Sequence, residues 1–177
     1  MFKASKLLVL VASLVLVLAP SISWGVNASA SELTTDDPIE YYKENSEYFD
    51  ISYEGDETTV TITDSDFKNL LDAKGIDSSF LFEKNAVMRS SSNGVTKIVW
   101  RGQARNGNVD LYLSKNWLNN MSKFGAGAAA AAVATILPGA GWSIALGGIG
   151  AVISGGNFQH GRVFVIRGFV YQYYYLQ

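Results

Sequence analysis

The chain contains no cysteine and only one histidine among its 177 residues. The absence of cysteine excludes a disulfide framework, a thiolate zinc site and a cysteine nucleophile. A single histidine excludes metal sites built from several imidazoles. We therefore expect no metal and no cofactor, and a core that holds together without covalent cross-links.

Groups that could support catalysis are also scarce. The sequence GWSIA at 141–145 approximates a nucleophile elbow, but it ends in Ala145 where that motif has glycine. A serine triad would need His160 together with an acid, and no acidic residue follows Asp110. The sequence thus predicts that the protein is not an enzyme.

The first thirty residues have the order of a secretory signal. Lys3 and Lys6 precede an apolar run at 7–19, which ends before Pro20, and an A-x-A site closes at Ala30. The run has 13 residues, fewer than the ~20 that span a membrane as a helix. We expect residues 1–30 to be a cleaved signal peptide and the protein to be secreted and extracellular.

Charge divides the remaining chain into two parts. Residues 31–83 hold fifteen acidic residues and three lysines, a net charge of −12, whereas residues 84–177 hold nine basic residues and one acid, a net charge of +8. Such asymmetry often separates two roles, with the basic part facing an anionic surface. The acidic part could dock on the basic part and mask it, or two solvated faces could simply differ in sign.

In the acidic part, a polar arm at 32–46 is followed by strands at 47–53 and 58–63. Asp64 or Ser65 then caps a short helix that carries Phe67, Leu70 and Leu71 on one face. The sequence therefore predicts a small β-hairpin and a helix for this part.

In the basic part, Asn106-Gly107 supplies the two positive-φ positions of a tight turn between strands at 95–104 and 108–113. Ser114 can cap the helix that follows. The stretch 162–176 is apolar or aromatic on both faces and is typical of one long strand covered on two sides. The sequence predicts an α+β fold that ends in a C-terminal strand.

No charged residue occurs between Lys123 and Arg162, and residues 125–156 include nine glycines and ten alanines. Because proline cannot continue a helix, Pro138 divides the stretch into helices at about 115–137 and 141–154, folded as a hairpin. Small residues recur four apart, a spacing that lets helix backbones approach closely. The residues expected to form this membrane-contacting or self-associating hairpin are Gly127, Ala131, Pro138, Gly139, Gly141, Trp142, Ala145, Gly147, Ala151 and Gly155.

The stretch from Gly125-Ala126-Gly127-Ala128 through Pro138-Gly139-Ala140-Gly141-Trp142 to Gly155-Gly156 resembles the Gly/Ala-rich segments of class II bacteriocins. It is also similar in texture to the hydrophobic hairpin of pore-forming colicins. The resemblance covers 32 residues and implies a secreted cationic domain that permeabilises bacterial membranes.

A helix that is apolar all round is buried or lies in a membrane, so the hairpin could equally be packed core. Four arginines, Arg101, Arg105, Arg162 and Arg167, could gather with Trp100, Tyr112 and the C-terminal tyrosines on one sheet surface. Such a surface suits anionic lipid headgroups or cell-wall polymers, and we expect no nucleic acid partner. The leading hypothesis is a membrane-active, antimicrobial-type effector whose acidic part acts as a brake. The alternative is a structural or adhesive extracellular module in which the hairpin is core.

Overall fold

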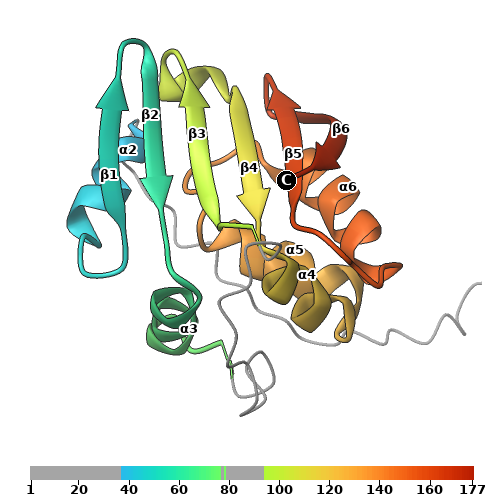
Figure 1. Ribbon diagram of the computed structural model, residues 1–177. Helices are drawn as coiled ribbons and strands as arrows, with labels where there is room; N and C mark the ends of the chain where they lie inside the picture. Colours follow the sequence, from blue (N-terminus) through green and yellow to red (C-terminus); the bar gives the residue numbers. More distant parts are fainter. Residues whose placement is uncertain (1–36, 77, 79–93) are drawn as a thin grey trace, which may run out of the picture.

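The computed structural model describes residues 37–76, 78 and 94–177. The predicted signal peptide at 1–30 lies outside the described residues, as do 31–36, 77 and 79–93. The predicted α+β class is confirmed, because five α-helices accompany one six-stranded antiparallel sheet in the described residues (Figure 1).

Each strand pairs with the next along the chain, so the sheet order is β1-β2-β3-β4-β5-β6. The acidic part contributes β1 and β2, and β2 pairs directly with β3 of the basic part, Val60 lying opposite Ile98. One sheet therefore runs across the charge boundary. The strands are β1 (Asp50–Glu54), β2 (Glu57–Thr61), β3 (Lys97–Arg101), β4 (Val109–Leu113), β5 (Arg162–Arg167) and β6 (Val170–Leu176).

Helices cover one face of the sheet. Figure 1 shows α2 and α5 behind the strands, α6 beside β6, and α3 and α4 where β2 and β4 lead out of the sheet. The helices are α2 (Pro38–Glu44), α3 (Asp64–Ala73), α4 (Lys115–Ser122), α5 (Gly125–Ala134) and α6 (Ser143–Ser154). The predicted cap Ser114 is confirmed, since its side chain accepts a hydrogen bond from Trp117 N. The cap of α3 is Thr63 rather than Asp64 or Ser65.

The core lies between the sheet and the helices. The predicted inward face of β4 is confirmed, since Val109, Leu111 and Leu113 are fully buried. The acidic part shares this core: the Tyr42 ring lies 6.3 Å from that of Trp100, and its hydroxyl donates to Ile136 O at 2.9 Å. The predicted polar arm at 32–46 is therefore wrong at 38–44, where Tyr41 and Tyr42 bury one side of α2.

The predicted single C-terminal strand is also wrong, because the chain reverses between β5 and β6. Gly168 and Phe169 both have positive φ, 57° and 64°, which is the two-residue turn that matches the twist of a hairpin. Phe169 accepts this unusual backbone because its ring packs on Trp142, with 4.8 Å between ring centroids. Tertiary packing thus places a tight turn where alternation alone indicated a continuous strand.

The predicted Asn106-Gly107 turn is replaced by a short 3₁₀ helix, η1 (Ala104–Asn106), and of the two predicted turn residues only Gly107 has positive φ. The Phe169 ring occupies the space where a Gly107 side chain would lie. The predicted helix at 115–137 is likewise two helices, because Gly125 has a φ of 82° that interrupts the α-helical backbone between α4 and α5.

Candidate functional site

The α5–α6 hairpin packs one side into the core and turns the other outward. Ala129, Val133, Ile149 and Ile153 are fully buried beneath the sheet. The backbones of α5 and α6 meet at Gly150, where an added Cβ would overlap the Ala126 carbonyl oxygen. The hairpin is therefore core on its inner side.

The residues predicted to form the hairpin surface divide between the two sides. The buried ones are Pro138, Trp142 and Ala145, and Ala131 is half-buried. The exposed ones are Gly127, Gly139, Gly141, Gly147, Ala151 and Gly155. An added Cβ at Gly127, Gly147 or Gly155 would meet nothing within 4 Å, so these glycines make no close helix contact among the described residues.

Sequence reasoning missed Gly150, the glycine at the helix contact. Its Cβ would also lie 3.3 Å from Ala130 Cβ, and Ala126 and Ala130 are four residues apart on α5. Almost every position of α5 is glycine or alanine, so the spacing of small residues could not select the pair that packs.

The outward side of the hairpin carries no charge and little large apolar surface. Ile144 is 69% exposed and is the only large hydrophobic residue among the described exposed positions of 125–156. None of the helices in the described ranges is both long and apolar enough to cross a membrane.

The four predicted arginines lie in three places. Arg101 and Arg167 come together on the face of the sheet opposite the core, where both contact Asp110, whose side chain is 5% exposed. Arg101 Nη2 lies 2.9 Å from Asp110 Oδ2, and Arg167 Nη2 lies 2.8 Å from Oδ1 without well-directed hydrogen-bond geometry. Glu57 pairs with the same Arg101, so an ion-pair network neutralises much of this positive charge.

Arg162 lies on the helix side of β5, where its guanidinium carbon is 4.0 Å from the centre of the Tyr174 ring and 4.9 Å from that of Phe158. Its Nε and Nη1 are buried without a hydrogen-bond partner among the described residues, so the ring faces stabilise its charge. Trp100 is fully buried in the core and adds nothing to a surface.

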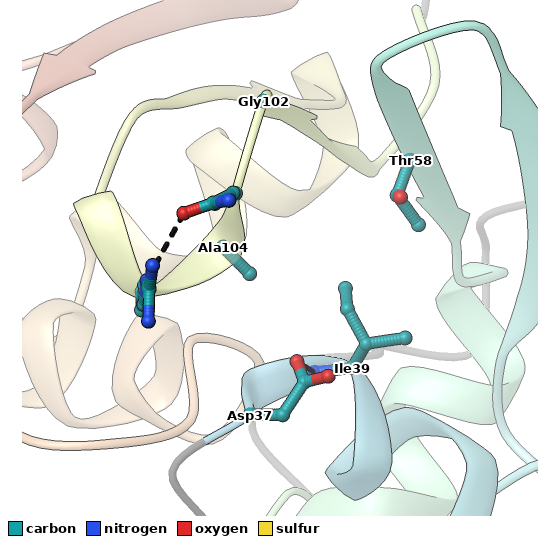
Figure 2. A pocket seen from close by; sticks show the side chains of 7 residues that line it. Asp37, Ile39, Thr58, Gly102 and Ala104 are labelled. Atoms are coloured by element: carbon teal, nitrogen blue, oxygen red, sulfur yellow. Dashed lines mark hydrogen bonds between the residues drawn. The ribbon is translucent and has the colours of Figure 1, made fainter.

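Arg105 lines an open pocket beside the connection between β3 and β4, at the end of the sheet opposite to Arg162. Figure 2 shows Ile39 from α2 and Ala104 from η1 turned toward each other across this pocket, with Thr58 and Asp37 at its sides. Asp37 already accepts from Ile39 N at 2.9 Å, and Arg105 Nε donates to Gln103 Oε1 at 3.0 Å. Each charged side chain of this pocket thus makes at least one hydrogen bond within the chain.

Three tyrosines, Tyr112, Tyr173 and Tyr175, form what we call the tyrosine face. Tyr112 lies opposite Val163, which in turn lies opposite Tyr175, and Tyr173 lies opposite Val165. Because successive side chains of a strand point to opposite faces and Phe164 belongs to the core, these tyrosines lie on the side away from the helices.

Two of the three rings in the tyrosine face are exposed to solvent. Tyr173 is 58% exposed and Tyr175 44% exposed. Burial and a hydrogen bond with Tyr112 raise the pKa of the Tyr175 hydroxyl. Lys97 Nζ lies 4.6 Å from the centre of the Tyr112 ring. One surface thus carries the three tyrosine rings, Lys97 and the Arg101–Asp110–Arg167 network.

No group of three metal-ligating side chains occurs within the part of the chain that the structure describes. His160, the one histidine, is exposed in a bend just before β5. Comparison with family models, with curated proteins and with solved structures finds no match for this chain.

Proposed function

We propose that the protein is an exported adhesive module that binds cell-wall glycan through the tyrosine face. The observation that carries the proposal is the pair of exposed rings, Tyr173 and Tyr175, beside Tyr112 on a sheet face that none of the described helices covers. The C–H bonds of a sugar ring pack on the electron-rich face of an aromatic ring, and tyrosine adds a hydroxyl for hydrogen bonding.

The charges beside these rings favour a glycan over an anionic lipid. Lys97, Arg101 and Arg167 are offset by Asp110 and Glu57, which leaves a net charge of +1 among these five side chains. That charge is too small for strong attraction to an anionic membrane, where each basic residue contributes only about 1 kcal/mol. The guanidinium and carboxylate groups are well suited to hydrogen-bond sugar hydroxyls.

Sedimentation of the secreted protein with purified, insoluble cell wall tests this proposal. We expect the double variant Tyr173→Ala/Tyr175→Ala to bind about 5- to 150-fold more weakly, because each aromatic contact contributes ~0.5–1.5 kcal/mol. Tyr53→Ala is the matched control, since Tyr53 is 62% exposed on β1 at the other edge of the sheet. Equal binding by all three proteins, or equal loss in the control, would refute the assignment.

A second candidate function is membrane activity, favoured by the uncharged outward side of α5 and α6. The helices have ten and twelve residues, or about 15 and 18 Å, against ~30 Å of hydrocarbon. Burial of Ile144 would contribute only ~1.5–3 kcal/mol, less than the ~4 kcal/mol of a millimolar complex. Membrane activity thus requires the hairpin to leave the sheet and expose Ile149 and Ile153.

Dye release from anionic vesicles distinguishes the two candidates. The adhesive module should bind cell wall and release no dye, whereas the membrane-active protein should release dye. Deletion of residues 31–83 cannot test the brake hypothesis cleanly, because it removes β2, the partner of β3, together with Tyr42 and Phe67 from the core.

A further inference from the structure

The outer edge of β6 is unusual for an exposed sheet edge. Its seven residues carry no charge and no proline, and Val170, Tyr173, Tyr174, Tyr175 and Leu176 are all exposed. Proteins commonly protect such edges with lysine, proline or a covering segment, because a free edge offers unpaired N–H and C=O groups to another strand.

The backbone direction along β6 follows from one hydrogen bond. Gln177 N donates to Gly161 O of the strand region that precedes β5, at 3.0 Å. Since hydrogen-bonding direction alternates along an antiparallel strand, the peptide groups of Tyr173 and Tyr175 also face β5. Those of Tyr174 and Leu176 therefore face away from the sheet and are available to a further strand.

The end of β6 is held in place before any partner arrives. The Gln177 side chain accepts from Val95 N at 2.8 Å and donates to Leu113 O at 2.9 Å, and the Tyr174 ring packs on Arg162. A strand that is already ordered loses little conformational freedom on binding.

We propose that the occupant of this edge is the β6 strand of a second copy of the chain, paired antiparallel about a twofold axis. Seven uncharged residues can meet themselves without like-charge repulsion, and the tyrosine rings of the two copies would lie side by side across the new strand pair. The twofold arrangement closes on itself and stops at a dimer.

The other edge of the sheet argues against the alternative pairings. β1 carries Asp50 and Glu54, and Glu57 lies opposite Glu54. A β1–β1 pair would bring like charges together, which destabilises cross-strand pairs. A β1–β6 pair would place carboxylates beside tyrosine rings and would continue into an open chain of molecules rather than a closed dimer.

The proposal is tested by sedimentation velocity of the secreted protein over a concentration series. We expect wild-type protein to shift reversibly from monomer to dimer, since a strand-only interface is small and weak. The variants Tyr173→Lys/Tyr175→Lys and Tyr173→Glu/Tyr175→Glu should each dimerise at least about tenfold more weakly. An equimolar mixture of the two should dimerise again, because with Tyr174 at the twofold axis residue 173 of one copy lies opposite residue 175 of the other.

Tyr53→Lys is the matched control and should dimerise like wild type. Amide exchange of wild-type Tyr174 and Leu176, followed by NMR, should slow as concentration rises, and this readout depends on no variant. A wild-type protein that stays monomeric with unchanged exchange, or charge variants that dimerise like wild type, would overturn the proposal. A mixture that stays monomeric would also overturn it, and loss of dimers in Tyr53→Lys would indicate β1–β6 pairing instead.

Discussion

Gly150 and Gly147 lie on the same helix, α6, and differ in what surrounds them. Gly150 is buried against α5, where a Cβ would overlap the Ala126 carbonyl oxygen. Gly147 is exposed, and a Cβ there would meet nothing within 4 Å. Replacing each by alanine therefore separates the cost of crowding the hairpin from the general effect of alanine in a helix.

Both substitutions improve helix propensity, but only Gly150→Ala crowds the contact with α5. Alanine stabilises a helix interior by about 1 kcal/mol relative to glycine, so Gly147→Ala should raise the free energy of unfolding by about that amount. Gly150→Ala receives the same gain but overpacks the contact, which typically costs ~1–3 kcal/mol. Because the obstacle is backbone rather than a flexible side chain, we expect the two variants to differ by ~1–3 kcal/mol.

Urea denaturation of the two variants, followed by tryptophan fluorescence, measures this difference. Trp100 and Trp142 report on the core beside the hairpin, with ring centroids 5.8 Å apart. The slopes of the two transitions should agree, so that the midpoints compare stability directly. If Gly150→Ala were stabilised as much as Gly147→Ala, α6 would not pack on α5 and the assignment of the hairpin's inner side to the core would be refuted.

Three further predictions concern the core and the sheet. Burial raises the pKa of Tyr41 to about 12 from 10.0. Because the pKa is higher in the folded state, Tyr41 should contribute stability below about pH 10 that is lost as pH rises to about 12. In alkaline unfolding curves, Tyr41→Phe should therefore show a smaller loss of stability over this pH range. Asp110→Ala should lower the free energy of unfolding by ~1–2 kcal/mol, because Arg101 and Arg167 lose their shared partner while solvent still reaches both guanidinium groups. An unchanged midpoint in chemical denaturation would show that the network contributes no stability. Ser114→Ala should lower the melting temperature through a loss of ~1 kcal/mol at the cap of α4, whereas Ser154→Ala, whose exposed hydroxyl only donates back to Ala151 O, should change it little.

Local signals in the sequence predicted those elements whose cause is also local. The alternation of Val109, Leu111 and Leu113 placed β4, and Ser114 began α4 as a side-chain cap. Phe67, Leu70 and Leu71 share the buried face of α3 as expected. In each case the residues that determine the structure lie within a few positions of one another.

The turns at 106–107 and 168–169 could not be predicted in the same way, because distant residues determine them. Asn106-Gly107 is the stronger turn sequence, yet the two-residue turn forms at Gly168-Phe169. There the Phe169 ring packs against Trp142 and over Gly107, a contact between residues far apart in the sequence. Local propensity was overridden by packing that no short window contains.

For the same reason, only part of the candidate site could be predicted from the sequence. The expectation that Arg101 and Arg167 share a surface follows from strand pairing and agrees with the structure. Arg105 lies in η1 rather than in a strand, and Arg162 lies on the helix side of β5, so neither shares the surface of Arg101 and Arg167. Tyr173 and Tyr175 lie beside Tyr112 only because the reversal at Phe169 pairs β6 with β5.

Hydrogen exchange of the α6 peptide 143–154 tests most directly whether the hairpin stays packed on the sheet when the protein meets cell wall or membrane. The protein is measured free, on purified cell wall and on anionic vesicles. We predict the same slow exchange in all three conditions, because Ile149 and Ile153 remain buried beneath the sheet. Exchange that changes on vesicles, together with release of an entrapped dye, would contradict this account and identify the hairpin as a membrane-inserting element.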